Sequence, residues 1–335
     1  MSEVFLFLLN RAAAAGWMLL ALLLLRPLLK KCPAWTRCLL WALAAVRLVF
    51  PVPIESVWSL VPSAELLTPE TVQFDTIPCV TSGIGTLDRA LNERLMEPAF
   101  RAAEPASANP LYLWIWIAGI IWVAGCCGLL LYALVRVWQT KRRLREAVPL
   151  DDGVLLCDAV PSPFILGVLR PQICLPSGLP EDARQYVLAH ERAHLARRDH
   201  WWKPLGYLLL CVYWFQPLCW LAYRCFCRDL ELACDERVIR TVNLDTRKAY
   251  SRALVDCSVQ GTAVLTCPLA FGEIAVKERV KRVLQYKKPT FWISLAAILL
   301  CAVLAVCFLT NRKEVNQAAQ PAADSSGSDL TLEDV

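Results

Sequence analysis

The chain has 335 residues, of which 57% are hydrophobic and 19% charged. This apolar excess excludes an ordinary soluble domain and indicates membrane spans. The net charge of +5 does not by itself indicate nucleic-acid binding, and we expect none. The 16 cysteines sit mostly in apolar runs, so we interpret them as small buried hydrophobic residues and not as a disulfide framework.

The sequence contains several candidate membrane spans. A helix needs roughly 20 apolar residues to cross a bilayer, and three stretches have that length: 4–29, 111–138 and 291–309. A fourth, 38–50, is shorter and contains Arg47, but counting it makes the basic loops alternate correctly. We therefore predict about four transmembrane helices, with three in a membrane region of residues 1–138 and the fourth at 290–310.

Charge predicts how these spans are oriented. The loops after the first and third spans and before the last are rich in Lys and Arg, which places them in the cytoplasm. Residues 51–110 contain only three Arg against eight Asp or Glu and should form an extracellular loop. Residues 311–335 are small, polar and acidic, which is typical of a disordered tail, here also extracellular. Both termini are then outside.

Residues 139–289 remain as one cytoplasmic domain. Short apolar runs separated by Pro and Gly predict strands, and the acidic residues after Pro180 predict the start of a helix. The domain is therefore α+β. The expected strands are 154–157, 164–168 and 172–175, and the helix is 181–197.

A metal-binding motif lies on that helix. The chain has three histidines, all within eleven residues, and two of them form His190-Glu191-x-x-His194. Residues four apart share one helix face, so both imidazoles can bind one Zn²⁺, while Glu191 activates the attacking water and passes its proton to the leaving amine. The alternative is an amphipathic helix with two partly exposed histidines.

Two residues compete to be the third ligand. His200 follows His194 at the metzincin spacing, but that pattern needs Gly where Arg197 stands, and on a continuing helix His200 points away. Glu231 is the better candidate, because it shares a helix face with Asp235, which could accept the free ring N–H of a ligand histidine. A surface helix of alternating charge would look the same.

The apolar segment between these sites has to turn back. Read as one straight helix, 201–223 would be about 35 Å long and would carry Glu231 away from His194. Because Gln216-Pro217 offers a break, we predict a helical hairpin. It either dips into the inner leaflet or stays within the domain.

These residues resemble those of the BlaR/MecR-type membrane zinc metallopeptidases, which are bacterial signal-transducing antirepressor proteases. The resemblance covers about 1–310 and rests on the span layout, Ser162 to Pro176, His190-Glu-x-x-His194 with Asp199-His200, and Glu231-Leu-Ala-Cys-Asp235. It implies a gluzincin-like zinc domain, with Glu231 as third ligand and Asp235 as its outer partner. It also implies a bacterial plasma-membrane location and cleavage of the protein itself or of a transcriptional repressor.

Family members that sense β-lactams have a penicillin-binding domain after the fourth span, where this sequence has a 25-residue tail without Ser-x-x-Lys. We therefore expect no covalent β-lactam binding, and a signal that arrives through 51–110, a partner or the membrane itself. A peptide substrate should add as a strand beside Phe164, Ile165, Leu166, Gly167 and Val168. The rival hypotheses are a non-catalytic membrane signalling protein and a housekeeping membrane-protein protease.

Overall fold

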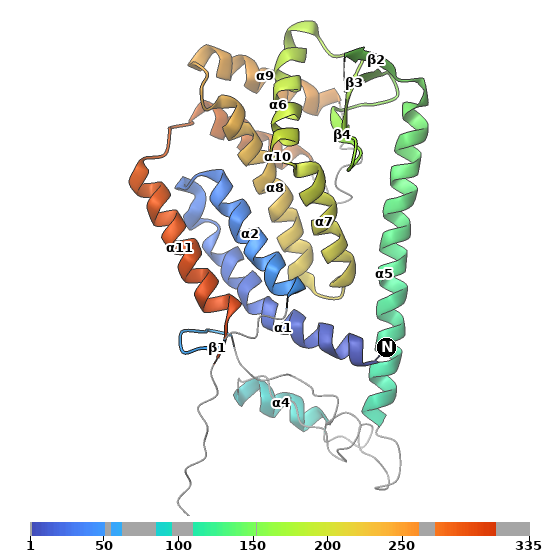
Figure 1. Ribbon diagram of the computed structural model, residues 1–335, viewed down its shortest axis with the longest axis vertical. Helices are drawn as coiled ribbons and strands as arrows, with labels where there is room; N and C mark the ends of the chain where they lie inside the picture. Colours follow the sequence, from blue (N-terminus) through green and yellow to red (C-terminus); the bar gives the residue numbers. More distant parts are fainter. Residues whose placement is uncertain are drawn as a thin grey trace, which may run out of the picture.

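The computed structural model describes residues 2–50, 55–61, 85–95, 110–151, 153–260 and 272–312, and it is mostly helical (Figure 1). The helices are α1 (Ser2–Leu25), α2 (Ala34–Val49), α4 (Gly85–Leu95), α5 (Pro110–Arg143), α6 (Glu181–Ala196), α7 (Asp199–Val212), α8 (Pro217–Ile239), α9 (Leu244–Gln260), α10 (Gly272–Leu284) and α11 (Phe291–Leu309). The strands are β1 (Glu55–Ser56), β2 (Val148–Asp151), β3 (Val154–Cys157), β4 (Phe164–Leu166), β5 (Gln172–Pro176) and β6 (Asn311–Arg312). Short 3₁₀ turns lie at Leu28–Lys31 and Leu144–Glu146.

Within the described residues, three helices are long and apolar enough to cross a membrane: Ser2–Leu25, Tyr112–Glu146 and Phe291–Leu309. They match the three long spans predicted from the sequence. The shorter span predicted at 38–50 corresponds to α2, which has 16 residues. Most of the predicted 51–110 loop and of the 311–335 tail lies outside the described residues.

The end of α2 is fixed to the end of α11. The Arg47 guanidinium donates to the Leu309 carbonyl (3.0 Å) and to Asn311 Oδ1 (2.8 Å), and β1 pairs in parallel with β6 just beyond. Arg47 is thus a buried cation with oxygen acceptors at the helix end, which is how charges in apolar segments are usually accommodated.

Helices α7 and α8 form the predicted hairpin, and Pro217 is the first residue of α8. Three hydrogen bonds fix its tip: Gln216 Nε2 to the Ala12 carbonyl, Tyr213 OH to the Leu48 carbonyl, and Trp122 Nε1 to the Val212 carbonyl, each 2.8 Å. The tip therefore packs among α1, α2 and α5 (Figure 1).

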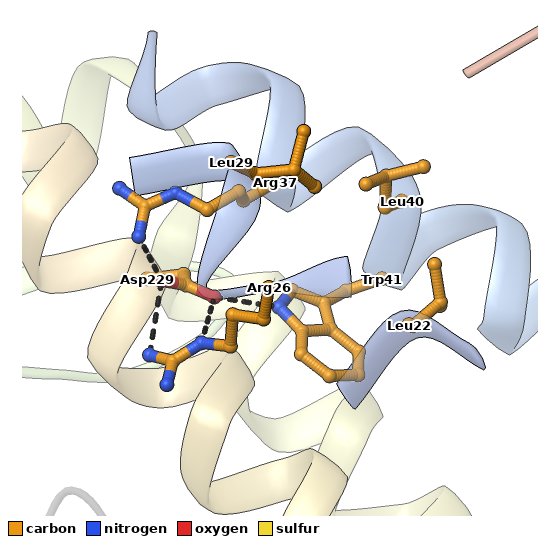
Figure 2. Close-up of a pocket in the computed structure, with 7 residues that line it drawn as sticks. All are labelled: Leu22, Arg26, Leu29, Arg37, Leu40, Trp41 and Asp229. Atoms are coloured by element: carbon orange, nitrogen blue, oxygen red, sulfur yellow. Dashed lines mark hydrogen bonds and ion pairs between the residues drawn. The ribbon is translucent and has the colours of Figure 1, made fainter. Parts of the chain in front are cut away.

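A buried carboxylate connects the first two helices to α8 (Figure 2). Asp229 is fully buried and accepts from Arg37 Nη1 (2.7 Å), Trp41 Nε1 (2.9 Å) and Arg26 Nε (3.1 Å). Arg37 is 3% exposed, so this ion pair is shielded from solvent. The cluster fixes α8 two residues before Glu231.

The four-stranded sheet has the order β2-β3-β5-β4, with β3 and β5 parallel and the outer pairs antiparallel. All three predicted strands are present, although β4 ends at Leu166 because Gly167 takes a positive φ of 99°. β2 was not predicted, because its four residues are exposed and include a proline. The sheet's apolar face packs against α6 through Ile173, Leu175, Ala183 and Val187, and so positions that helix.

Candidate metal centre

Helix α6 presents His190 and His194 on one face, one turn apart. It starts after Pro180 with Glu181 and Asp182 in its first turn, where acidic side chains oppose the helix dipole. Both imidazoles are buried, at 6% and 5% exposure. Their Nε2 atoms lie 3.2 Å apart.

Glu231 reaches the same point from α8. Its Oε2 lies 3.4 Å from His190 Nε2, and its Oε1 lies 3.5 Å from His194 Nε2. Side chains from two helices, 37 to 41 residues apart in sequence, thus converge. The structure brings together the three residues that the sequence singled out as ligands.

Each histidine has a partner for its other ring nitrogen. Asp199 Oδ2 lies 2.7 Å from His194 Nδ1. His190 Nδ1 lies 2.8 Å from the Tyr250 hydroxyl, which donates to Asp235 Oδ1 (2.6 Å), and Asp235 itself is 3.3 Å from His190 Nδ1. Because Tyr250 uses its proton for Asp235, it accepts from His190, and both Nδ1 atoms are donors.

This tautomer makes the arrangement fit a metal ion. With protons on both Nδ1 atoms, the two Nε2 atoms, 3.2 Å apart, are the ring nitrogens that can bind a metal ion. Two nitrogens bound tetrahedrally to one zinc ion at about 2.0–2.1 Å lie roughly 3.3 Å apart, and two imidazoles with a carboxylate are a known catalytic donor set.

The electrostatics also favour a cation here. Burial and Lys203 disfavour a charged His194, yet Glu231, Cys234 and Asp199 outweigh them and raise its pKa to about 10. For Glu231, burial is outweighed by Lys203 and the two histidines, so its pKa lies well below the usual value and it is ionised. A carboxylate in this form is ready to bind a metal.

Cys234 is a further potential donor. Its thiol forms with His190 and His194 a group whose ligand atoms all lie within 4.8 Å of one another. The thiol is fully buried and donates to the His190 backbone carbonyl (3.3 Å). It therefore helps to fix α8 against α6.

Glu191 lies beside the two histidines on α6 and is 7% exposed. Next to it are β5 and α9. Burial is the main cause that raises the pKa of the Cys174 thiol to about 12, followed by Cys157 and the Glu191 charge. Burial is also the main cause that raises the pKa of the Cys257 thiol to about 11, and the Glu191 charge is the next. The predicted base thus lies near the thiols of Cys174 on β5 and Cys257 on α9.

Two cations flank Glu231. Lys203 Nζ lies 2.8 Å from Oε1, and Arg279 Nη1 lies 3.4 Å from Oε2. Arg279 also makes a two-pronged contact with Asp235, at 2.7 and 2.8 Å. This contact outweighs burial and holds the pKa of Asp235 below its usual value.

His200, the rival ligand, lies outside the group. Helix α6 ends at Ala196, one residue before the predicted end, and Arg198 takes a left-handed φ of 60°. This turn brings Asp199 back to His194, while the His200 ring lies against Trp201.

Sequence reasoning gave no role to Asp199, Lys203, Tyr250 or Arg279. Asp199 had a local signal, because it is an acidic residue five positions after His194 and just beyond the predicted helix end. Tyr250 and Arg279 come from α9 and α10, and no spacing rule links them to His190.

The Peptidase_M56 family model, described as BlaR1 peptidase M56, matches residues 6–283. The chain is 22% identical over 214 residues to the methicillin resistance mecR1 protein of Staphylococcus aureus, covering 55% of this chain and 37% of that protein. It is 27% identical over 158 residues to the regulatory protein BlaR1 of Bacillus licheniformis, covering 40% of this chain and 26% of that protein. The match thus spans well under half of these relatives' length. The family match covers most of the chain, and the resemblance inferred from the motifs is confirmed: the protein belongs to the BlaR1 peptidase M56 family.

Proposed function

We propose that this protein is a membrane-embedded zinc endopeptidase of regulated proteolysis, which cleaves itself, a transcriptional repressor, or both. The observation that carries the proposal is the convergence of His190, His194 and Glu231 with the ring tautomers a metal needs. Family membership and the names of the relatives, a regulatory protein and a methicillin resistance protein, support a signalling role.

The residues divide the work of peptide hydrolysis. His190, His194 and Glu231 would hold zinc, which when bound polarises the scissile carbonyl and makes the attacking water more acidic. Glu191 takes the proton of that water and delivers it to the leaving amine. Asp199, Tyr250 and Asp235 hold the imidazoles in the tautomer that leaves both Nε2 atoms free.

We further propose four spans, with α2 as the short one. A 16-residue helix is about 24 Å long, less than the hydrocarbon core, but α2 ends level with α11 through the Arg47 contacts. α4, from the acidic 51–110 segment, and the sheet lie at opposite ends of the bundle (Figure 1). With the basic loops inside, the sheet and the metal centre face the cytoplasm, and the α7–α8 hairpin enters the membrane from that side.

The open edge of β4 is the proposed substrate strand. Phe164 pairs with Cys174, and the charge of Glu191 contributes to the raised pKa of the Cys174 thiol. Within the described residues, the other edge of β4 has no strand beside it. An extended peptide adding there would lie one strand beyond β4 and two strand spacings from β5.

Glu191→Gln is the decisive variant, because it removes the base and leaves every metal donor in place. Glu181→Gln is the matched control, since it is on the same helix but its side chain is 93% exposed. We expect both purified proteins to hold about one zinc per chain, and only Glu191→Gln to lose self-cleavage and to accumulate an uncut protein in cell-wide proteomics. One accumulating repressor supports signalling, whereas many accumulating membrane proteins support housekeeping proteolysis. The proposal of an enzyme would be refuted if the Glu191→Gln strain showed no change in cleavage, or if the purified wild-type protein held no metal.

A further inference from the structure

The guanidinium of Arg279 is fixed beside the three proposed ligands. Its Nε and Nη2 bind the two oxygens of Asp235 at 2.7 and 2.8 Å, and its side chain is 16% exposed. An ion pair between Arg228 and Glu278 attaches α10 to α8 one residue before it. A planar fork held in this way has a defined direction.

The rest of the fork faces the ligand atoms. Nη2 lies 3.2 Å from His190 Nε2, and Nη1 lies 3.4 Å from Glu231 Oε2. A metal would take the one lone pair of His190 Nε2, so Nη2 would lose this acceptor. It would also share the charge of Glu231, which would make Oε2 a weaker acceptor for Nη1. Mostly buried donors of a charged group need a replacement oxygen in the same place.

Arg279 also shares a neighbour with the proposed base. Both Glu191 and Arg279 are close enough to Cys257 on α9 to influence its thiol. Lys203 contacts the other oxygen of Glu231, because its Nζ donates to Oε1 at 2.8 Å. We therefore assign Lys203 to holding the Glu231 carboxylate.

Accordingly, we propose that Arg279 is a catalytic residue that donates hydrogen bonds to the oxyanion formed from the scissile carbonyl. The inference rests on the proposed function. In the step concerned, the water oxygen bonds to the carbonyl carbon, the π electron pair moves onto the carbonyl oxygen, and the water proton moves to Glu191. Arg279 transfers no proton, and its positive charge faces the new negative charge in a water-poor site.

The test uses the full-length detergent-solubilised protein loaded with Co²⁺, whose visible spectrum reports ligands entering the site. Methylphosphonate is a tetrahedral anion with oxygens to spare for Arg279, whereas ethanethiol binds a metal through sulfur and offers no oxygen. We expect Arg279→Ala to bind methylphosphonate roughly 10- to 100-fold more weakly and ethanethiol within about twofold of wild type. Arg279→Lys should recover part of the loss, because it keeps the charge without the fork.

Arg282→Ala is the matched control. It removes the same charge from the same helix, but Arg282 contacts Glu278 and the Lys30 carbonyl, away from the metal centre. Equal methylphosphonate affinity in Arg279→Ala and wild type would overturn the inference, as would a loss seen in Lys203→Ala instead. If wild type takes up no Co²⁺ or Zn²⁺, the proposed function fails first; if it takes up metal but Arg279 does not matter, only the inference fails.

Discussion

Asp229→Asn tests how much the protein depends on the buried cluster that joins α1 and α2 to α8 (Figure 2). The substitution removes the negative charge shared by Arg26 and Arg37 and keeps the shape of the side chain. Removing one partner of a buried ion pair costs about 3–5 kcal/mol of unfolding free energy. Because the Arg26 side chain is 19% exposed and water can relieve part of its charge, we expect the lower end, about 3 kcal/mol.

The measurement is a sodium dodecyl sulfate titration followed by tryptophan fluorescence. Arg26→Met should cost only about 1–2 kcal/mol, because Asp229 keeps Arg37 and Trp41. Combining Asp229→Asn with Arg37→Met should cost less than the sum of the two single changes by roughly 1–3 kcal/mol, since the pair is coupled. Asp245→Asn, with a side chain 88% exposed, is the control. A cost below about 1 kcal/mol for Asp229→Asn, or simple additivity, would refute the reasoning.

Four further outcomes are expected. Asp199→Ala should weaken zinc binding roughly 10- to 100-fold in a chelator competition, because His194 loses the acceptor of its Nδ1 proton; unchanged affinity would contradict that role. Tyr250→Phe should weaken zinc binding less, since Asp235 still lies 3.3 Å from His190 Nδ1, and a larger effect than that of Asp199→Ala would be inconsistent with this. Gly167→Ala should lower the free energy of unfolding by about 1–3 kcal/mol, because φ is 99° and a Cβ would lie 2.6 Å from the Arg170 carbonyl oxygen; a neutral effect argues against the turn. Removing zinc with a chelator should lower the thermal midpoint of wild type but not of His190→Ala.

The sequence was most informative where chemistry is local. The spacing of His190 and His194 places both rings on one helix face whatever surrounds them, and Pro217 ends one helix and begins another wherever it lies. The spans follow from apolar length in the same way. Such features depend only on helix geometry and on the backbone N–H donor that proline lacks, whose absence destabilises a helix interior.

The rest depends on contacts between distant segments. The helix face that Glu231 shares with Asp235 made it a candidate, but the resemblance was needed to favour it clearly, because its distance from His190 depends on where the α7–α8 hairpin turns. Arg279, 89 residues after His190, reaches it only through the packing of α10 on α8. The contact of Asp199 with His194 could not be predicted, because it depends on the left-handed conformation of Arg198, which favours glycine.

Hydrogen bonds join helix α2 to helix α8 close to the metal centre. The backbone N–H of Ala34 donates to Glu236 (2.7 Å), and Arg37 and Trp41 donate to Asp229. Glu231 follows Asp229 by only two residues, which is about 3 Å of helix rise. The two histidines belong to α6, which packs against the sheet. Metal–ligand distances tolerate only about 0.2 Å, so a sub-ångström slide of α2 along its axis would be enough to change how the Glu231 carboxylate meets the two rings.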